Sequence, residues 1–219
     1  MRFVRDNSLS IVLLLSFFAL WLGQSIAGRF AYNKERADEN LPPLTYASYI
    51  ASSHFWEATT ENWESEFLQM FVYIGLTAFL LQRGSAESKD PNGENPEDED
   101  PALHRNDPEA PWPVRHGGWV LWLYQYSLSL AFLTLFLVSI ASHGWSSYLL
   151  YNEEQILIGK PTVDFSDYLQ TSNFWFESLQ NWQSEFLAVA AIVLLSIFLR
   201  HRGSPESKPV ATPHWQTGE

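Results

Sequence analysis

The sequence predicts an all-α membrane protein with four transmembrane helices, arranged as two tandem, parallel-repeat helical hairpins whose long helices extend outward from the membrane. Two observations carry this prediction. No charged residue occurs in residues 7–28 or 116–152, and an apolar helix of this length can cross roughly 30 Å of hydrocarbon. The chain also contains one stretch twice, as FWEATTENWESEFL at 55–68 and as FWFESLQNWQSEFL at 174–187.

The two copies are related by one offset, with no gap. Trp63 recurs 119 positions later as Trp182, and RGSAESK at 83–89 recurs as RGSPESK at 202–208. The residues kept in both copies recur at steps of three and four, which places them along one stripe of a helix. We therefore expect an internal duplication in which both stripes meet similar partners, most simply the other half of the chain across a pseudo-twofold axis. The stripe comprises Phe55, Trp56, Asn62 and Trp63 in the first copy, and Phe174, Trp175, Asn181 and Trp182 in the second.

The first two-span repeat is expected to occupy residues 1–89. Its first span, at about 8–28, has the basic start and apolar core of a secretory signal peptide. We interpret it as a transmembrane helix because it aligns with residues 127–147, which lie inside the chain. The helix should continue outward until the prolines at 42–43 stop it.

A short amphipathic segment at 46–51 then leads into the helix that carries the repeated stripe. This helix should run from about Ser53 to Gln82 and end at Gly84, because glycine suits the C-cap of a helix. At 1.5 Å per residue it would be roughly 45 Å long, so its first turns must stand outside the hydrocarbon.

Residues 90–114 separate the two repeats and are dominated by proline, glycine and carboxylates. Such a segment has little to bury, so we expect a flexible, acidic, cytoplasmic linker. The second two-span repeat should occupy residues 115–208, with helices over about 119–151 and 172–201. The tail at 209–219 is expected to be disordered.

Basic residues lie at the chain ends that a four-span topology places on one side of the membrane. Positively charged flanks stay in the cytoplasm. This predicts a multi-pass protein with both termini and the linker inside, and with both copies of the repeated stretch outside or at the outer interface. The basic residues are Arg2, Arg5, Arg83, Lys89, Arg115, Arg200, Arg202 and Lys208.

Composition excludes several function classes. The net charge of −12 argues against a nucleic-acid partner. The chain has no cysteine, and hence no disulfide framework, thiolate nucleophile or cysteine metal site. It also contains no nucleotide-binding loop, GxSxG elbow or HExxH motif. We therefore expect no catalytic residues, no cofactor and no metal, and we do not expect an enzyme.

Glu66 and Glu185 are the candidate functional pair. About 16 residues separate Glu66 from Arg83 and about 14 separate Glu185 from Arg200, so each stretch is shorter than the hydrocarbon core. A charged side chain at one end of each stretch must therefore lie at or below the membrane–water interface. Two interpretations stay open: the glutamates serve helix N-termini while the neighbouring asparagines bond adjacent helices, or they face each other and bind protons or a cation.

Two further candidates accompany this pair. His143, near the outer end of the third long helix, is either a proton partner for the glutamates or a helix-packing residue. The RGSxESK motifs are either helix caps with a positive flank or sites for a lipid headgroup phosphate. The residues of such headgroup sites would be Arg83, Ser85, Arg202 and Ser204.

The motifs NWESEFL…RGSAESK and NWQSEFL…RGSPESK resemble the signature of an uncharacterised family of bacterial integral membrane proteins, known as a domain of unknown function. The resemblance covers nearly the whole chain apart from the linker and the tail. It implies a location in the bacterial inner membrane. It implies no activity, cofactor or catalytic residue.

From these observations we expect a non-enzymatic protein of the lipid bilayer. Its outer aromatic and acidic surface would bind a membrane-protein partner or a second copy of the chain, which would give a homo-oligomer. The alternative is a small proton- or cation-linked transporter or channel-like protein that uses Glu66 and Glu185.

Overall fold

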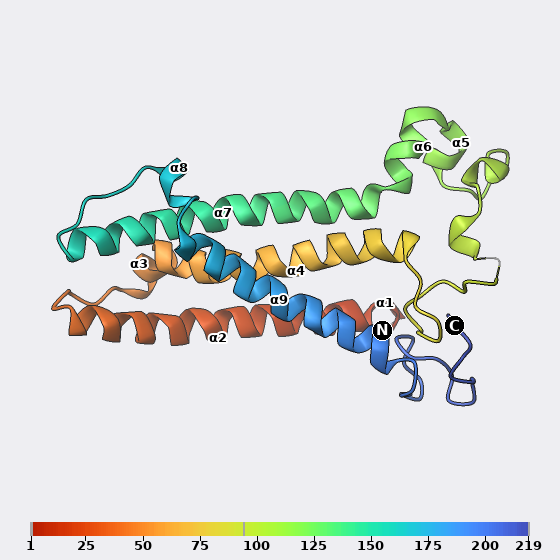
Figure 1. The fold of residues 1–219 in the computed structure, drawn as a ribbon, viewed down its shortest axis with the longest axis horizontal. Coiled ribbons are helices and arrows are strands. Elements are labelled where there is room, and N and C mark those ends of the chain that lie inside the picture. The colour runs from red at the N-terminus through yellow and green to blue at the C-terminus, as the bar shows by residue number, and fades with distance from the viewer. Residues whose placement is uncertain (1, 94, 219) are drawn as a thin grey trace. The chain divides into compact units, whose positions relative to one another are not determined.

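The structure, a computed structural model, describes residues 2–93 and 95–218. The described residues form helices joined by turns and contain no strand, which confirms the all-α class. They divide into two compact units. Unit 1 extends to Thr60 and includes Ser142–Thr171, and unit 2 comprises Glu61–Ala141 and the chain from Ser172 onward. The long helices are α2 (Ser8–Asp38), α4 (Ser53–Phe79), α7 (Ser127–Leu157) and α9 (Ser172–Leu195), labelled in Figure 1.

Among the described residues, α2 and α7 are the helices long and apolar enough to cross a membrane, with mean hydropathies of 2.0 and 1.6 over their most apolar windows. Both helices expose large apolar side chains, such as Leu13 (60%) and Phe18 (55%) on α2 and Val138 (61%) on α7. The described residues therefore contain two candidate membrane spans. The other two predicted spans, α4 and α9, carry more polar side chains in their first turns.

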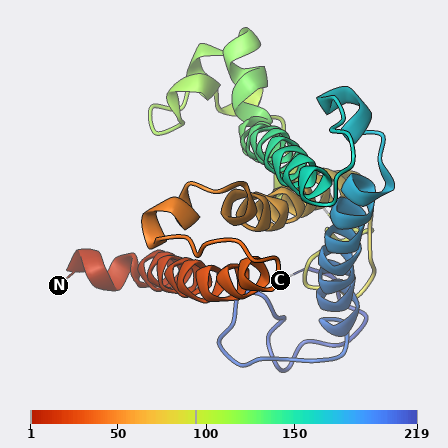
Figure 2. The same ribbon diagram turned by 90° about the vertical axis from the view of Figure 1, so that its left-hand side faces the viewer.

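Unit 1 is built around aromatic side chains. The short helix α3 (Tyr46–Ile50) lies against α2, as Figure 2 shows. The ring of Phe55, at the start of α4, packs against the rings of Trp21 and Tyr49, with centroid distances of 6.1 and 5.7 Å. Tyr168, in α8 (Phe165–Tyr168), is also buried and packs 5.3 Å from the ring of Tyr151.

The same hydrogen bonds recur at positions 119 apart. In the last turns of α2, the Asn33 side-chain amide donates to the carbonyl of Leu44 (3.0 Å), and its oxygen accepts from the Leu44 amide (2.7 Å). In the last turns of α7, Asn152 forms the same two bonds with Val163, at 3.1 and 2.9 Å. Each asparagine thus closes the turn that follows its long helix. The two helices also match in length, with 31 residues each.

The segment between the repeats contains short helical turns. Acidic side chains form local contacts in this segment: the Asp100 carboxylate accepts a hydrogen bond from the Ala102 amide (2.9 Å), and Asp98 forms an ion pair with Lys89 (2.7 Å). The other short helices are α1 (Arg2–Asp6) near the N-terminus, η1 (Pro96–Asp98) and η2 (Pro101–His104) in the linker, α5 (Trp112–His116) at its end, and α6 (Gly118–Gln125) at the start of the second repeat.

Several helices end earlier than the sequence predicts. A break at Tyr126 separates α6 from α7, where one helix over 119–151 was expected. The last long helix, α9, ends at Leu195 instead of near residue 201. Beyond Leu195, the Arg200 guanidinium donates to the carbonyls of Ser196, Ile197 and Leu199 at 2.7–3.2 Å. These bonds satisfy carbonyls that a continuing helix would have bonded to its own amides.

Candidate functional site

Within unit 2, α4 and α9 meet through side chains from both repeats. The Asn181 side-chain amide donates to Glu61 Oε1 at 2.5 Å, and the Trp182 indole nitrogen donates to Glu64 Oε1 at 2.8 Å. One turn further along, the Gln69 side chain donates to the Glu185 backbone carbonyl at 2.9 Å. Positions 61 and 64 of α4 are neighbours on the helix surface because they are three residues apart.

This contact buries a carboxylate. Glu64 is 0% exposed, and Ser65 beside it is 2% exposed. Burying an ionised carboxylate is costly unless hydrogen bonds stabilise it, and the Trp182 indole supplies one such bond. The Trp182 ring is itself held by the rings of Phe136 and Trp175, at 6.3 and 6.4 Å. The polar contact between α4 and α9 is therefore flanked by packed aromatic rings.

On α9, the stripe residues Asn181 and Trp182 bind α4, as described above. On α4 the equivalent residue Asn62 is exposed, and Trp63 is half-buried, as Trp182 is. At the start of each stripe the pattern is equal, since Phe55 and Phe174 are buried, whereas Trp56 (38%) and Trp175 (44%) are exposed.

Glu66 and Glu185 are brought near each other in unit 2. Glu66 is exposed and Glu185 is half-buried, and their charges lie close enough to interact. The residues that sequence reasoning did not assign to the site are Glu61, Glu64 and Gln69. The sequence does set Glu61 and Glu64 apart, because the second repeat has Gln180 and Gln183 at the equivalent positions.

The two RGSxESK motifs form the same turn, and both arginines are exposed. Ser85 Oγ accepts from the Glu87 amide (3.1 Å), and Ser204 Oγ accepts from the Glu206 amide (3.2 Å). Ser85 is also fully buried, and its hydroxyl is hydrogen-bonded to the Ser196 hydroxyl at 3.0 Å. In the first motif the Ser85 hydroxyl is thus buried and bonded to another side chain, whereas Ser204 in the second motif is only half-buried.

The C-terminal tail crosses the first of these turns. Lys208 is 1% exposed, and its ammonium donates to the carbonyls of Gly84, His214 (3.2 Å) and Gln216 (2.8 Å). The Gly84 amide in turn donates to Thr217 Oγ1 at 2.9 Å. Burial, and secondarily the nearby charge of Arg200, lower the pKa of Lys208.

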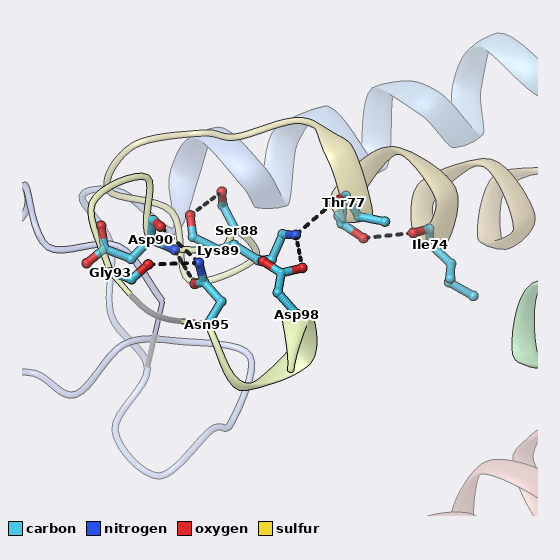
Figure 3. Close-up of polar contacts among 9 residues, drawn as sticks. Ile74, Thr77, Ser88, Lys89, Asp90, Gly93, Asn95 and Asp98 are labelled. Atoms are coloured by element: carbon cyan, nitrogen blue, oxygen red, sulfur yellow. Dashed lines mark hydrogen bonds and ion pairs between the residues drawn. The ribbon is translucent and has the colours of Figure 1, made fainter. Parts of the chain in front are cut away.

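The equivalent Lys89 has other partners, which Figure 3 shows together with the linker. Its ammonium donates to the Ala78 carbonyl (2.8 Å) at the end of α4 and to Asp98 (2.7 Å). Nearby, the Asn95 side chain accepts from the Asp90 amide at 2.8 Å. These residues line an open cavity of about 820 Å³ whose walls also include the end of α4 and residues 216–218.

The model of one family, described as a domain of unknown function (DUF6766), matches residues 1–219. The chain belongs to the DUF6766 family. No curated protein and no solved structure matches it.

Two remaining predictions concern this DUF6766 chain. His143 is fully buried in the part of α7 that belongs to unit 1, whereas Glu66 and Glu185 belong to unit 2. Across residues 2–93 and 95–218, no group of three or more His, Asp or Glu side chains could hold a metal ion.

Proposed function

We propose that this chain is a non-enzymatic protein of the bacterial inner membrane whose outer aromatic and acidic surface binds a protein partner. The observation that carries the proposal is Trp145, which is 52% exposed although its ring is held in place. The Tyr148 and Phe165 rings lie 5.5 and 5.6 Å from it. A rigid, exposed tryptophan is typical of the residues that dominate binding energy in protein interfaces.

The surroundings of Trp145 favour a protein over lipid headgroups. Asp164 and Asp167 flank Phe165 and are both exposed, and the Asp164 side chain makes no cap bond to α8. Carboxylates repel the anionic surface of a membrane. They suit a partner that offers basic side chains. We call Trp145, Tyr148, Phe165, Asp164 and Asp167 the outer patch.

We also propose that the chain crosses the membrane four times. The apolar ends of α4 and α9 support lipid contact, since Phe79 at the end of α4 is 84% exposed and Leu194 and Leu195 at the end of α9 are each 54% exposed. The bond from Asn33 to Leu44 recurs 119 positions later between Asn152 and Val163, which supports two helical hairpins that repeat in the same orientation. The basic flanks favour both termini in the cytoplasm.

A photo-crosslinking amino acid at position 145 tests the outer patch. In intact membranes of the native cells, we expect Trp145→benzoylphenylalanine to form a protein adduct of discrete mass. The adduct should fall about tenfold when Asp164→Asn and Asp167→Asn are added, because the charge contacts that orient a basic partner are lost. The measurement is the adduct yield on a denaturing gel, with the partner identified by mass spectrometry.

The matched control places the same photo-crosslinker at Leu13, which is 60% exposed on the apolar part of α2. It should react with lipid alone. Adducts of Trp145→benzoylphenylalanine with lipid alone, or protein adducts of equal yield from both positions, would contradict the outer patch as a binding surface.

A second candidate function, proton or cation transport, is favoured by the proximity of the charges on Glu66 and Glu185. Glutamine keeps the size of glutamate and much of its hydrogen bonding. If the pair carries ions, Glu66→Gln with Glu185→Gln should reduce flux into proteoliposomes about tenfold or more, while helical content stays unchanged. Absence of flux in the wild type, or equal flux in both proteins, would remove this function.

A further inference from the structure

The rest of the chain covers the two RGSxESK turns unequally. We call residues 83–89 the first turn and residues 202–208 the second turn. In the first turn, Gly84 is buried and its amide donates to Thr217 Oγ1 at 2.9 Å. In the second turn, the equivalent Gly203 is exposed, and a Cβ built there would meet nothing within 4 Å among the described residues. The C-terminal tail therefore fills the first turn, and the second turn stays open.

A cavity of about 650 Å³ lies at the second turn and is lined by hydrogen-bond donors. Arg202 lines it and is exposed. Ser204 also lines it, and its hydroxyl accepts from the Glu206 amide at 3.2 Å, so the hydroxyl hydrogen can still be donated. These donors suit a phosphate group, because a guanidinium can bind two phosphate oxygens at once.

A second cavity, of about 360 Å³, adjoins the first at the end of α9. The two cavities share His201 and Ser207 in their linings. Ile192, Leu195 and Leu199 line the second cavity, and these side chains are 39%, 54% and 59% exposed. A cavity with polar donors beside one with apolar side chains suits an amphiphile, whose headgroup and hydrocarbon chain need different surroundings.

The charges around the two cavities favour an anion. Arg200 and Arg202 each contribute a guanidinium, and Glu206 is the one acid among the described residues that line these cavities. The Arg200 guanidinium is held in place, since it donates to the carbonyls of Ser196 and Thr212 at 2.9 and 3.2 Å. A phosphate whose headgroup carries no cation therefore suits this site better than a zwitterionic headgroup.

We propose that these two cavities bind an anionic phospholipid of the cytoplasmic leaflet. Arg202 and Ser204 would bind its phosphate, and one acyl chain would lie along Ile192, Leu195 and Leu199. A free phosphate ion would gain nothing from the apolar side chains, whereas a lipid chain would bury them. Basic pockets at the cytoplasmic ends of membrane helices recognise lipid headgroups by this chemistry. The inference rests on the proposed span α9 and not on the outer patch.

Binding of defined lipids to the purified chain tests the phosphate contact. Native mass spectrometry in detergent gives the dissociation constants of phosphatidylglycerol, which is anionic, and of phosphatidylcholine, which is zwitterionic. We expect phosphatidylglycerol to bind about tenfold more tightly, and Arg202→Gln to weaken its binding about tenfold, because a charge-assisted contact to phosphate is lost. The matched control is Arg83→Gln, which removes the equivalent exposed arginine of the first turn and should leave binding unchanged.

A pair of leucines at equivalent positions tests the acyl-chain contact. Leu199 is 59% exposed, and Leu80, which lies 119 positions earlier near the end of α4, is 60% exposed. Leu199→Gln should weaken phosphatidylglycerol binding about tenfold, because it replaces an apolar surface that the lipid chain buries. Leu80→Gln should leave binding unchanged. Circular dichroism should give the same helical content for all four variants.

Inorganic phosphate distinguishes a lipid from a free ion. We expect an excess of inorganic phosphate to leave phosphatidylglycerol bound. Displacement of the lipid by phosphate, with Leu199→Gln binding as the wild type does, would mean a free-phosphate site and would overturn the proposal. Equal affinity for the two lipids, or equal weakening by Arg202→Gln and Arg83→Gln, would overturn it too.

Failure of the lipid site is separable from failure of the proposed spans. The spans are judged by whether a membrane-impermeant maleimide reaches Lys160→Cys in intact cells. A labelled Lys160→Cys together with no discrimination between the lipids removes the lipid site alone. A protected Lys160→Cys removes α9 as a span and the lipid site with it. The Trp145 adduct reports on the outer patch and is independent of both results.

Discussion

Lys208 shows how one residue acquires different partners in the two repeats. It and Lys89 end the same motif, yet Lys89 reaches Ala78 and Asp98, whereas Lys208 is buried against the carbonyls of the tail. A buried ammonium is tolerated when several acceptors surround it. The tail provides these acceptors, and Lys208 therefore joins the end of the second repeat to the turn at Gly84 in the first.

Gly84 and Gly203 give a matched test of this tail contact. Both have left-handed backbones, with φ of 86° and 87°, so alanine costs about 1–2 kcal/mol at either position. A Cβ at Gly84 would also lie 2.5 Å from the His214 carbonyl oxygen, whereas a Cβ at Gly203 would meet nothing within 4 Å. We therefore expect Gly84→Ala to lower the free energy of unfolding by about 1–3 kcal/mol more than Gly203→Ala does.

The measurement is unfolding in detergent followed by tryptophan fluorescence, together with hydrogen exchange of the Gly218 amide, which donates to the Ser85 carbonyl at 3.0 Å. Exchange at Gly218 should accelerate in Gly84→Ala only. Equal destabilisation by both alanines, with Gly218 still protected, would mean that the tail does not pack on this turn.

At the scale of helices, the pattern of apolar and charged residues predicted the long helices and their order, but not all of their ends. α2 stops at Asp38, just before the proline pair that predicts the stop. The end of α9 was not predictable in this way, because Ser196, just beyond it, bonds a group that is distant in the sequence. Ser196 Oγ, for example, accepts from the Ala86 amide at 3.3 Å.

The same limit applies to the candidate site. Periodicity identified the stripe that contains Asn181 and Trp182, since helical spacing is a local property. It did not identify Glu61 and Glu64 as their acceptors, because the face of α4 that meets α9 depends on packing between helices. The exchange of two glutamates for Gln180 and Gln183 was the one sequence signal of this difference.

For the whole molecule, the number of spans decides which segments face the cytoplasm. Length and composition support α2 and α7 as spans, and we propose α4 and α9 as the other two. With the N-terminus inside, four spans place the linker inside and the turn after α7 outside. If only α2 and α7 crossed, the linker would be outside and the turn after α7 would be inside.

Single cysteines in the full chain separate these topologies, because the chain has none of its own. The four-span topology predicts that Glu39→Cys and Lys160→Cys react with a membrane-impermeant maleimide in intact cells, since both side chains are exposed in the turns after α2 and α7. Glu109→Cys in the linker and Pro205→Cys in the second RGSxESK motif should react only after the membrane is permeabilised, because basic flanks hold these segments inside. Labelling of Glu109→Cys in intact cells, with Lys160→Cys protected, would establish two spans and would remove α4 and α9 from the membrane.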